Sequence, residues 1–351
     1  MTSSGRRRGG SIHDVIALFD ALGVEANFDL GDDQGGEKLA AKVKEVFDHG
    51  REQPHVRYGK RVEAMFEFVA ASLNNCIMIK QEDAGRVYLA EELEATPPDY
   101  ELVLRDGRRF LVEVKNHHAD LGTPWKLRNR DRQALLRYAQ LSDRPLYFAI
   151  YWSRLKLWSL VPDSALVSEG ARSHITLDSA MKSNFMSEIL GDVMVATTPP
   201  LTFRVYADAA LPRVLHPDGH VEFTTKRVEL LCAGRRLLRE VERKLCLYFM
   251  LHGAWSASDS WELVLEDGAV SAIDLHFAHE EAVGGQDFQF LGPISAMISR
   301  HYDALTIRNG DVIRLRADAE TDKLGIVIPP DYRGQALPLW RFRLQPNVAP
   351  T

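Results

Sequence analysis

The hydrophobic and polar positions of this chain predict helices near its beginning and a sheet after them. Two amphipathic helices are expected over residues 11–22 and 37–49, with a loop rich in Gly and Asp between them. A third helix begins near residue 59. Its apolar side chains follow helical spacing and are Val62, Met65, Phe66, Val69 and Leu73. The apolar run at residues 76–80 is expected to form the first strand of a sheet.

A β-hairpin is predicted over residues 98–116, which read PDYELVLRDGRRFLVEVKN. Asp106-Gly107 separates two apolar runs, and an Asp-Gly pair in that position is a strong short-range hairpin signal. Side chains alternate along a strand, so Glu113 and Lys115 share one face of the second strand. Folding the hairpin can bring Asp99 beside Glu113.

Two carboxylates and one ammonium group therefore converge at one place on a sheet. Such a group can hold a divalent metal next to a cation, which suits hydrolysis of a phosphodiester. The competing interpretation is that Pro98-Asp99 only starts a turn and that residues 113–115 form a solvated face. We favour a functional site, because this strand is apolar enough to be central, where ionised groups are costly without a partner or a metal.

The pattern Pro98-Asp99 followed by Glu113-Val114-Lys115 resembles that of the PD-(D/E)xK nuclease superfamily. This superfamily includes restriction endonucleases, archaeal-type Holliday-junction resolvases and anti-phage nucleases. The resemblance covers roughly residues 59–160, and its order of helices and strands agrees with the periodicity of the chain. It implies an α/β fold with a restriction-endonuclease-like core, in which helices flank a mixed central sheet.

The resemblance also implies two flanking site residues. Glu63, in the run Gly59-Lys60-Arg61-Val62-Glu63, matches a helical Glu that joins the metal site in the resolvase-like branch. Gln133, on a predicted helix before the strand at residues 146–152, matches a Gln that often supports the site from behind.

A divalent cofactor, Mg²⁺ or Mn²⁺, follows from the same resemblance. Asp99 and Glu113 are expected to hold it, together with the Val114 carbonyl and with Glu63 directly or through water. Lys115 is expected to orient or deprotonate the attacking water, or to stabilise the charge that develops on the phosphate.

The length of 351 residues favours more than one domain. We expect a short helical N-terminal segment (1–52), a nuclease domain (53–162) and an α+β C-terminal domain (163–351) whose role the sequence does not specify. Strands are predicted in the last part at 201–206, 221–224, 261–265, 270–277, 312–315 and 324–328, and helices at 227–251 and 293–303. Asp267-Gly268 predicts a second hairpin.

The formal net charge is −6, which is unusual for a protein that grips nucleic acid. Residues 98–160, however, contain twelve Lys and Arg against seven Asp and Glu. The candidate nucleic-acid contacts in this stretch are Lys126, Arg128, Arg130, Arg132 and Arg137. For any one of them, a solvated helix face is an equally good interpretation.

Composition adds broad limits. Hydrophobic residues make up 45 % and charged residues 26 %, as in ordinary globular proteins, and no apolar run approaches the ~20 residues of a membrane span. Cys76, Cys232 and Cys246 lie in apolar runs without metal-ligand spacing, so we expect free thiols in a reducing, cytoplasmic compartment.

Three further polar features receive a plainer interpretation. Asp331 lies in a second PPDY sequence that no acidic strand follows, so it is expected to be a turn residue. His276 and His279 lack a third ligand with recognised spacing and are not predicted to bind metal. His117 and His118 lie close after Glu113, where substrate contact and a polar loop explain them equally well.

Taken together, the sequence predicts a Mg²⁺-dependent endonuclease that acts on DNA in bacterial anti-phage defence or DNA repair. A homodimer is a weak expectation, because cutting two strands takes two sites. The alternative is a non-catalytic, nuclease-fold DNA-binding or assembly subunit of a larger defence complex, which the acidic net charge favours. A third reading is a resolvase-like enzyme selective for branched DNA.

Overall fold

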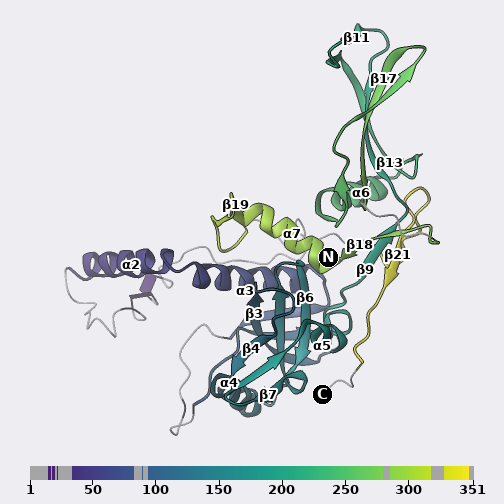
Figure 1. Cartoon of the computed structure of the whole chain (residues 1–351). Helices are drawn as coiled ribbons and strands as arrows, with labels where there is room; N and C mark the ends of the chain where they lie inside the picture. The colour runs from purple at the N-terminus through teal and green to yellow at the C-terminus, as the bar shows by residue number, and fades with distance from the viewer. Residues whose placement is uncertain are drawn as a thin grey trace.

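The chain folds as a mixed α/β protein in which helices accompany a mixed sheet (Figure 1). The computed structural model describes residues 15–16, 18–19, 22, 34–82, 89, 94–279, 285–317 and 328–347. Figure 1 shows a body built around the central sheet and a narrow β-structure that projects from it.

The central sheet has five strands in the order β1-β2-β3-β5-β6. Their bounds are β1 (Cys76–Gln81), β2 (Tyr100–Leu104), β3 (Arg109–His117), β5 (Leu146–Trp152) and β6 (Leu157–Pro162). β3 and β5 run parallel, whereas the other neighbours are antiparallel, so the sheet is mixed as expected. All seven residues of β5 are buried, which places this strand in the interior of the body.

The predicted hairpin is confirmed. Gly107 has a positive φ of 87°, a conformation that a residue without Cβ adopts freely, and the Asp106 carboxylate accepts a hydrogen bond from the Arg108 N–H. β2 and β3 then pair with Tyr100 opposite Val112 and Glu101 opposite Leu111.

Helices cover both faces of the sheet. α3 (Pro54–Ser72) packs Phe66 and its neighbours against one face, in a cluster that includes Val112 and Val114 of β3. α4 (Asn129–Ser142) packs Leu135 against the other face, in a cluster that includes Leu111. The two faces of β3 therefore contact different helices, as its alternating side chains require.

The chain after β6 remains attached to this body. η1 (Asp163–Ala165), β7 (Val167–Glu169), β8 (Arg172–Ile175) and α5 (Leu177–Lys182) follow in sequence. β8 pairs with β4 (Trp125–Arg128), which precedes α4, and the short η2 (Met186–Leu190) comes next. Residues 163–182 thus add a small three-stranded sheet, β4-β8-β7, beside the central one.

The projecting arm is a six-stranded antiparallel sheet with a two-stranded extension (Figure 1). Its strands are β10 (Leu201–Ala207), β13 (Thr225–Cys232), β14 (Arg235–Arg236), β15 (Ser256–Ala257), β16 (Glu262–Glu266) and β17 (Ala269–Ala278), and the extension is β11 (Arg213–Leu215) with β12 (Val221–Phe223). At its base lie α6 (Glu240–His252) and the sheet of β18 (Gln289–Pro293), β9 (Met194–Thr197) and β21 (Trp340–Phe342).

The last helix returns to the body. α7 (Ile294–Thr306) packs against α3 through Tyr302 and Phe68, whose ring centroids lie 5.3 Å apart. The Trp158 indole N–H of β6 also donates to the Ser299 hydroxyl at 2.8 Å. A helix from the end of the chain therefore lies beside the sheet, and the short β19 (Ile307–Arg308) and β20 (Asp311–Val312) follow it.

The predicted helix over residues 227–251 is wrong. Its first part is strand β13, which pairs with β10 over seven positions, and only residues from Glu240 onward are helical. The physical cause is the Ala233-Gly234 pair, whose φ angles of 48° and 76° form a tight turn that ends β13 and starts β14. Apolar residues on both sides of this turn imitate a single helical pattern.

Most other expectations for this region are confirmed. The strands at 201–206, 221–224, 261–265 and 270–277, the helix at 293–303 and the turn at Asp331 are present within a few residues. The helix expected at 37–49 is α2 (Gly35–Arg51), and the strand expected at 312–315 is reduced to the end of β20. The helix at 11–22 and the strand at 324–328 fall largely outside the described residues. Within the described residues, no helix has the length and apolar character needed to cross a bilayer.

Candidate functional site

The hairpin brings Asp99 and Glu113 together at the edge where β2 begins. Continuing the β2–β3 register by one residue places Asp99 opposite Glu113, and the Val114 N–H donates to the Asp99 carboxylate at 2.6 Å. Asp99 is only 7 % exposed. The residue that sequence analysis expected to offer a carbonyl to a metal therefore holds the Asp99 side chain through its amide.

The Asp99 carboxyl is held in a strongly unfavourable environment for charge. Burial, followed by repulsion from Glu113 and Glu63, raises its pKa to about 8, although Lys115 and the Val114 N–H favour the ionised form. Like-charged groups that converge on a buried carboxyl and outweigh its partners are a feature of functional sites.

Lys115 lies among the three carboxylates. Its ammonium group contacts the Glu113 carboxylate at 2.5 Å. Burial opposes the charge of Lys115, but the nearby Glu113, Asp99 and Glu63 outweigh it and raise the pKa of the amine. Lys115 therefore carries a proton at neutral pH.

Glu63 lies on α3 and approaches Asp99, Glu113 and Lys115 from that helix. Its carboxylate binds Lys60 of the same helix at 2.7 Å, and its backbone carbonyl accepts a hydrogen bond from the Tyr100 hydroxyl at 3.2 Å. α3 is thus tied to β2 directly next to Asp99. The structure brings together four of the five residues that sequence analysis selected for catalysis.

Gln133 does not join this group. It is exposed on α4, where the buried residues are Leu135 and Ala139, and it lines neither of the hollows beside Lys115. The helical spacing of α4 explains this, because Gln133 lies two positions from Leu135 and so faces away from the sheet.

The carboxylates do not form a ready-made metal centre. Within the described residues, no three His, Cys, Asp or Glu side chains are placed so that they could hold a metal ion. Each acidic side chain has its own partner instead: the Val114 N–H for Asp99, Lys115 for Glu113 and Lys60 for Glu63.

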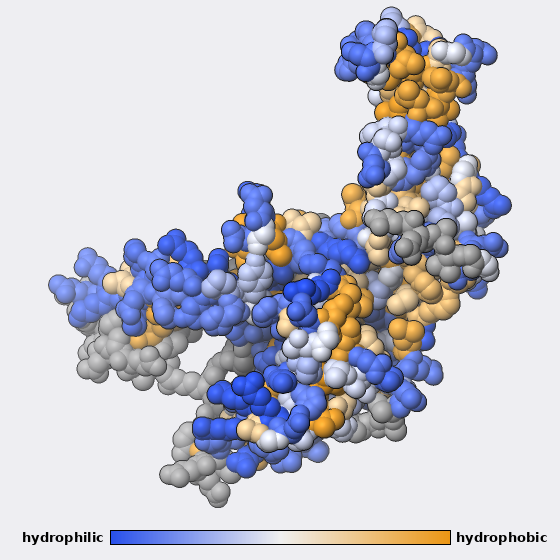
Figure 2. Space-filling view, in the orientation of Figure 1, coloured by the Kyte–Doolittle hydropathy of each residue, from blue (hydrophilic) through white to orange (hydrophobic). Residues whose placement is uncertain are grey.

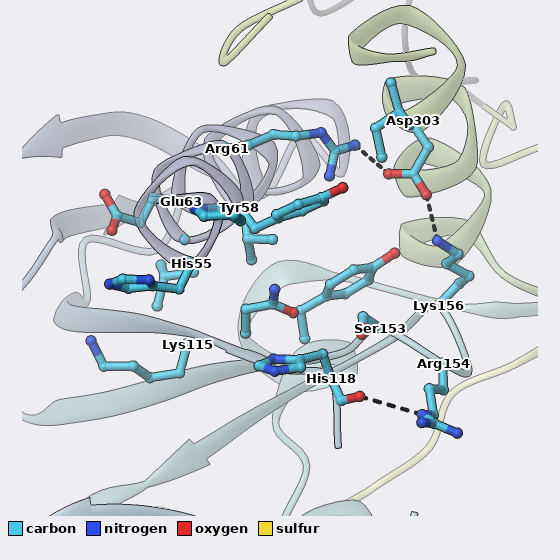
Figure 3. Close-up of a pocket in the computed structure, with 17 residues that line it drawn as sticks. His55, Tyr58, Arg61, Glu63, Lys115, His118, Ser153, Arg154, Lys156 and Asp303 are labelled. Atoms are coloured by element: carbon cyan, nitrogen blue, oxygen red, sulfur yellow. Dashed lines mark hydrogen bonds and ion pairs between the residues drawn. The ribbon is translucent and has the colours of Figure 1, made fainter. Parts of the chain in front are cut away.

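Two hollows meet at Lys115. The larger has a volume of about 850 Å³ and is lined by α3, the ends of β3 and β5, and α7 (Figure 3). Figure 3 shows Glu63 and Lys115 toward one end of this cleft and Asp303 and Lys156 toward the other. The smaller hollow, of about 540 Å³, lies on the side of Glu113 and Arg128.

The five basic residues selected from the sequence separate into groups. Arg128 and Arg130 line the smaller hollow, but they also bind Asp131 and Glu94. Arg132 is structural, since it binds the Asp163 carboxylate at 2.7 Å and the hydroxyls of Ser168 and Ser173. Lys126 and Arg137 are exposed and line neither hollow.

The two histidines after β3's acidic residue differ in environment. His117 is buried against Trp152, with ring centroids 4.7 Å apart, and this burial lowers its pKa. His118 lines the large cleft, and its backbone carbonyl accepts a hydrogen bond from Arg154 at 3.3 Å. Only His118 is placed where it can contact a ligand.

Sequence analysis missed the residues at the far end of the large cleft. Arg61 and Lys156 both bind the Asp303 carboxylate there, and Tyr151 lines the same wall. Asp303 lies on α7, more than one hundred residues after the hairpin, so no local pattern pairs it with Arg61. The sequence offered one indication of this contact: the charged Arg61 stands beside the apolar Val62 on a helix that covers a sheet, where an arginine needs an acidic partner.

Comparison with solved structures finds structural neighbours, of which one weak example is Hjc. Hjc is a Holliday junction resolvase from the archaeal hyperthermophile Archaeoglobus fulgidus, with 16 % sequence identity and a TM-score of 0.29, and the match covers 38 % of this chain and 96 % of the resolvase. No family model and no curated protein matches the chain. The likeness to the resolvase is too slight to carry weight for an activity.

Proposed function

We propose that this protein is a metal-dependent nuclease that hydrolyses phosphodiester bonds in DNA. The observation that supports the proposal is the convergence of Asp99, Glu113 and Glu63 around Lys115, at the junction of two hollows. Three carboxyl groups face two amines, because Lys60 pairs with Glu63 and Lys115 with Glu113, so the buried Asp99 is left as an acidic excess. Such an excess is costly unless a cation of the working state balances it.

The donor set fits Mg²⁺ or Mn²⁺, since every candidate ligand is a carboxylate oxygen. Asp99 and Glu113 would hold the ion, and Glu63 would complete the site. Glu113 and Glu63 would turn from Lys115 and Lys60 to do so. When bound, such an ion polarises a phosphoryl oxygen and lowers the pKa of a coordinated water.

The protein's own residues supply the remaining functions. The Val114 N–H fixes the Asp99 carboxylate, so this ligand is positioned before any ion arrives. Lys115 is protonated, which favours a role in orienting the attacking water or stabilising negative charge on the phosphate over a role as a general base. Arg128 and Arg130 line the smaller hollow, where they can contact a passing phosphate backbone.

Nuclease assays on purified protein test the proposal. Wild type is incubated with labelled linear, supercoiled, single-stranded and four-way DNA, in Mg²⁺ and in EDTA. Cleavage is expected in Mg²⁺ only, and Lys115→Ala is expected to abolish it. Lys182→Ala is the matched control, because Lys182 is an exposed lysine on α5 that pairs with the exposed Asp178. Cleavage by the Lys115→Ala variant, or cleavage by wild type in EDTA, would contradict the proposal.

A non-catalytic assembly subunit is the second candidate, and the projecting arm favours it. The outer strands of the arm expose Trp261, Leu263 and Leu265, and Figure 2 shows apolar surface gathered there. Exposed apolar patches of this kind often bind partners. DNA binding without cleavage of any of the four substrates, in Mg²⁺ or Mn²⁺, would support this candidate over the nuclease.

A further inference from the structure

The large cleft extends well beyond the acidic group at Lys115. Figure 3 shows Ser153, Lys156 and Asp303 of α7 toward its far end, and Tyr151 of β5 also lines the cleft. None of these residues belongs to the cluster of Asp99, Glu113 and Glu63. The far end is therefore a separate binding surface that adjoins the proposed site of cleavage.

Two polar atoms in the wall of this cleft have no hydrogen-bond partner among the described residues. Tyr151 is 2 % exposed, and its hydroxyl makes no hydrogen bond within the described residues; the same holds for the side-chain carbonyl oxygen of Asn116. Buried polar groups are hydrogen-bonded in the great majority of proteins, so two such atoms beside one cavity are groups that a molecule bound there, water or ligand, would satisfy. One offers a donor and the other an acceptor.

The charge of the cleft selects an anion. Arg61 and Lys156 share the single carboxylate of Asp303, and this shared contact leaves one positive charge in excess. Lys115 and Arg154 also line the cleft, but Lys115 is paired with Glu113 and Arg154 with Asp120. The positive charge left over from Arg61 and Lys156 therefore lies at the far end of the cleft, where it suits phosphate.

The size and rings of the cleft suit a single nucleotide. A volume of about 850 Å³ is in the range of pockets that enclose small molecules. A DNA duplex, whose major groove alone is about 12 Å wide, is too broad to enter it. The rings of His55, Tyr58 and His118 line the cleft, and aromatic side chains of this kind stack on unpaired bases.

We propose that the cleft binds one unpaired nucleotide of the DNA strand next to the scissile phosphate, so that the protein selects DNA with single-stranded ends over blunt duplex. The inference deepens the proposed nuclease function and rests on it for the position of the scissile phosphate. The Tyr151 hydroxyl and the Asn116 side chain bind the base or sugar, and Arg61 and Lys156 attract the phosphate.

Binding measured in EDTA tests the inference without requiring cleavage. Fluorescence anisotropy compares a duplex with a four-nucleotide single-stranded end, a blunt duplex of the same sequence, and free deoxynucleoside monophosphates as competitors. Wild type is expected to prefer the single-stranded end about tenfold. Tyr151→Phe removes one hydroxyl and is expected to reduce this preference about fivefold, because one hydrogen bond to the ligand is lost.

Tyr332→Phe is the matched control. Tyr332 is also buried, but its hydroxyl donates to the Leu337 carbonyl at 2.8 Å and it does not line the cleft. The control is expected to lower the melting temperature and leave the preference for single-stranded ends intact. Tyr151→Phe is expected to keep or raise the melting temperature, because the hydroxyl it removes has no partner in the described part of the chain.

The inference is overturned if wild type shows no preference for the single-stranded end, or if Tyr151→Phe leaves that preference unchanged. It is also overturned if free nucleotides bind the cleft and the single-stranded end does not, which would make the cleft a small-molecule site. A loss of melting temperature in Tyr151→Phe equal to that in the control would assign the hydroxyl to the fold. Failure of catalysis alone leaves end-selective binding detectable, and cleavage without end preference leaves the nuclease proposal standing.

Discussion

Buried charges occur both in the central sheet and in the projecting arm, but the balance of the charges differs. In the arm, Arg204 of β10 and Asp274 of β17 are directly opposite each other and form two hydrogen bonds, of 2.6 and 2.5 Å. One cation meets one anion, and the pair is satisfied. At the central sheet, Lys115 pairs with Glu113 and Lys60 with Glu63 of α3. Asp99, however, has no cation of its own among the described residues, and its pKa rises to about 8.

This comparison separates two roles for buried charge. A balanced, bidentate pair such as Arg204–Asp274 joins two strands and needs nothing further. An acidic excess such as the group at Asp99 lowers the free energy of unfolding of the metal-free protein. A bound cation would raise it again. The composition of a charge cluster therefore indicates function better than its burial does.

Substitution in the acidic group is expected to give the largest effect on activity. Glu113→Gln keeps the size of the side chain but removes the charge, and it should lower the cleavage rate by about 10²–10³-fold or more. Because the change also removes repulsion from Asp99, the melting temperature should not fall. Single-turnover cleavage and thermal unfolding check both points. Near-normal cleavage by Glu113→Gln would place the acidic excess outside catalysis.

Substitution in the balanced pair should give the opposite result. Arg204→Ala leaves Asp274, whose side chain is 4 % exposed, without its partner, and should lower the free energy of unfolding by about 3 kcal/mol. Cleavage per folded molecule should be unchanged at a temperature where the variant is folded. Denaturant unfolding and the nuclease assay provide these values.

Lys182→Ala, at an exposed pair, serves as the reference for Arg204→Ala and should change stability by less than about 0.5 kcal/mol. An Arg204→Ala variant that is stable but inactive would remove the distinction between the two clusters.

A smaller effect is expected in the pH dependence of stability. The folded-state pKa of Asp99 lies above its ordinary value of 3.8, so the protonated carboxyl favours folding. Its contribution is complete below about pH 4 and is lost as the pH rises toward 8. Asp99→Asn should therefore flatten the decline in metal-free stability over this window, and should stabilise the protein at pH 8 by at least about 1.4 kcal/mol, the value of one pKa unit.

Unfolding in EDTA at several pH values measures the effect of Asp99→Asn. The Asn side chain can still accept the Val114 N–H, so the hydrogen bond is preserved in this comparison. If the free energy of unfolding of wild type and of Asp99→Asn changed with pH in the same way, the pKa of Asp99 would not be raised in the folded protein.

Local patterns predicted the acidic group well because its main parts are close in sequence. Asp106-Gly107 fixed the hairpin, and the hairpin fixed the pairing of Asp99 with Glu113. The family resemblance supplied Glu63, on a helix that the spacing of apolar residues predicted. The far wall of the cleft comes from α7, and its contact with Arg61 depends on how distant elements pack. No periodicity within one segment contains that information.

The failures of prediction also have physical causes. Helical spacing was extended across Ala233-Gly234, where two left-handed residues turn the chain between two strands of the arm. Gln133 was selected by resemblance, although its position relative to Leu135 directs it to solvent. Arg132 belonged to a basic run, yet its neighbours in space use it to fasten α4 to η1.

A crystal soaked in Mn²⁺ and examined by anomalous scattering tests the central claim most directly. The account predicts one strong peak between the Asp99 and Glu113 carboxylates, with oxygen ligands at roughly 2.0–2.3 Å, and with Glu63 turned from Lys60 toward the ion. The same soak of Asp99→Asn should show the peak weakened or lost. A structure of wild type at high Mn²⁺ with no peak at this position, and with Glu113 still bound to Lys115, would contradict the account.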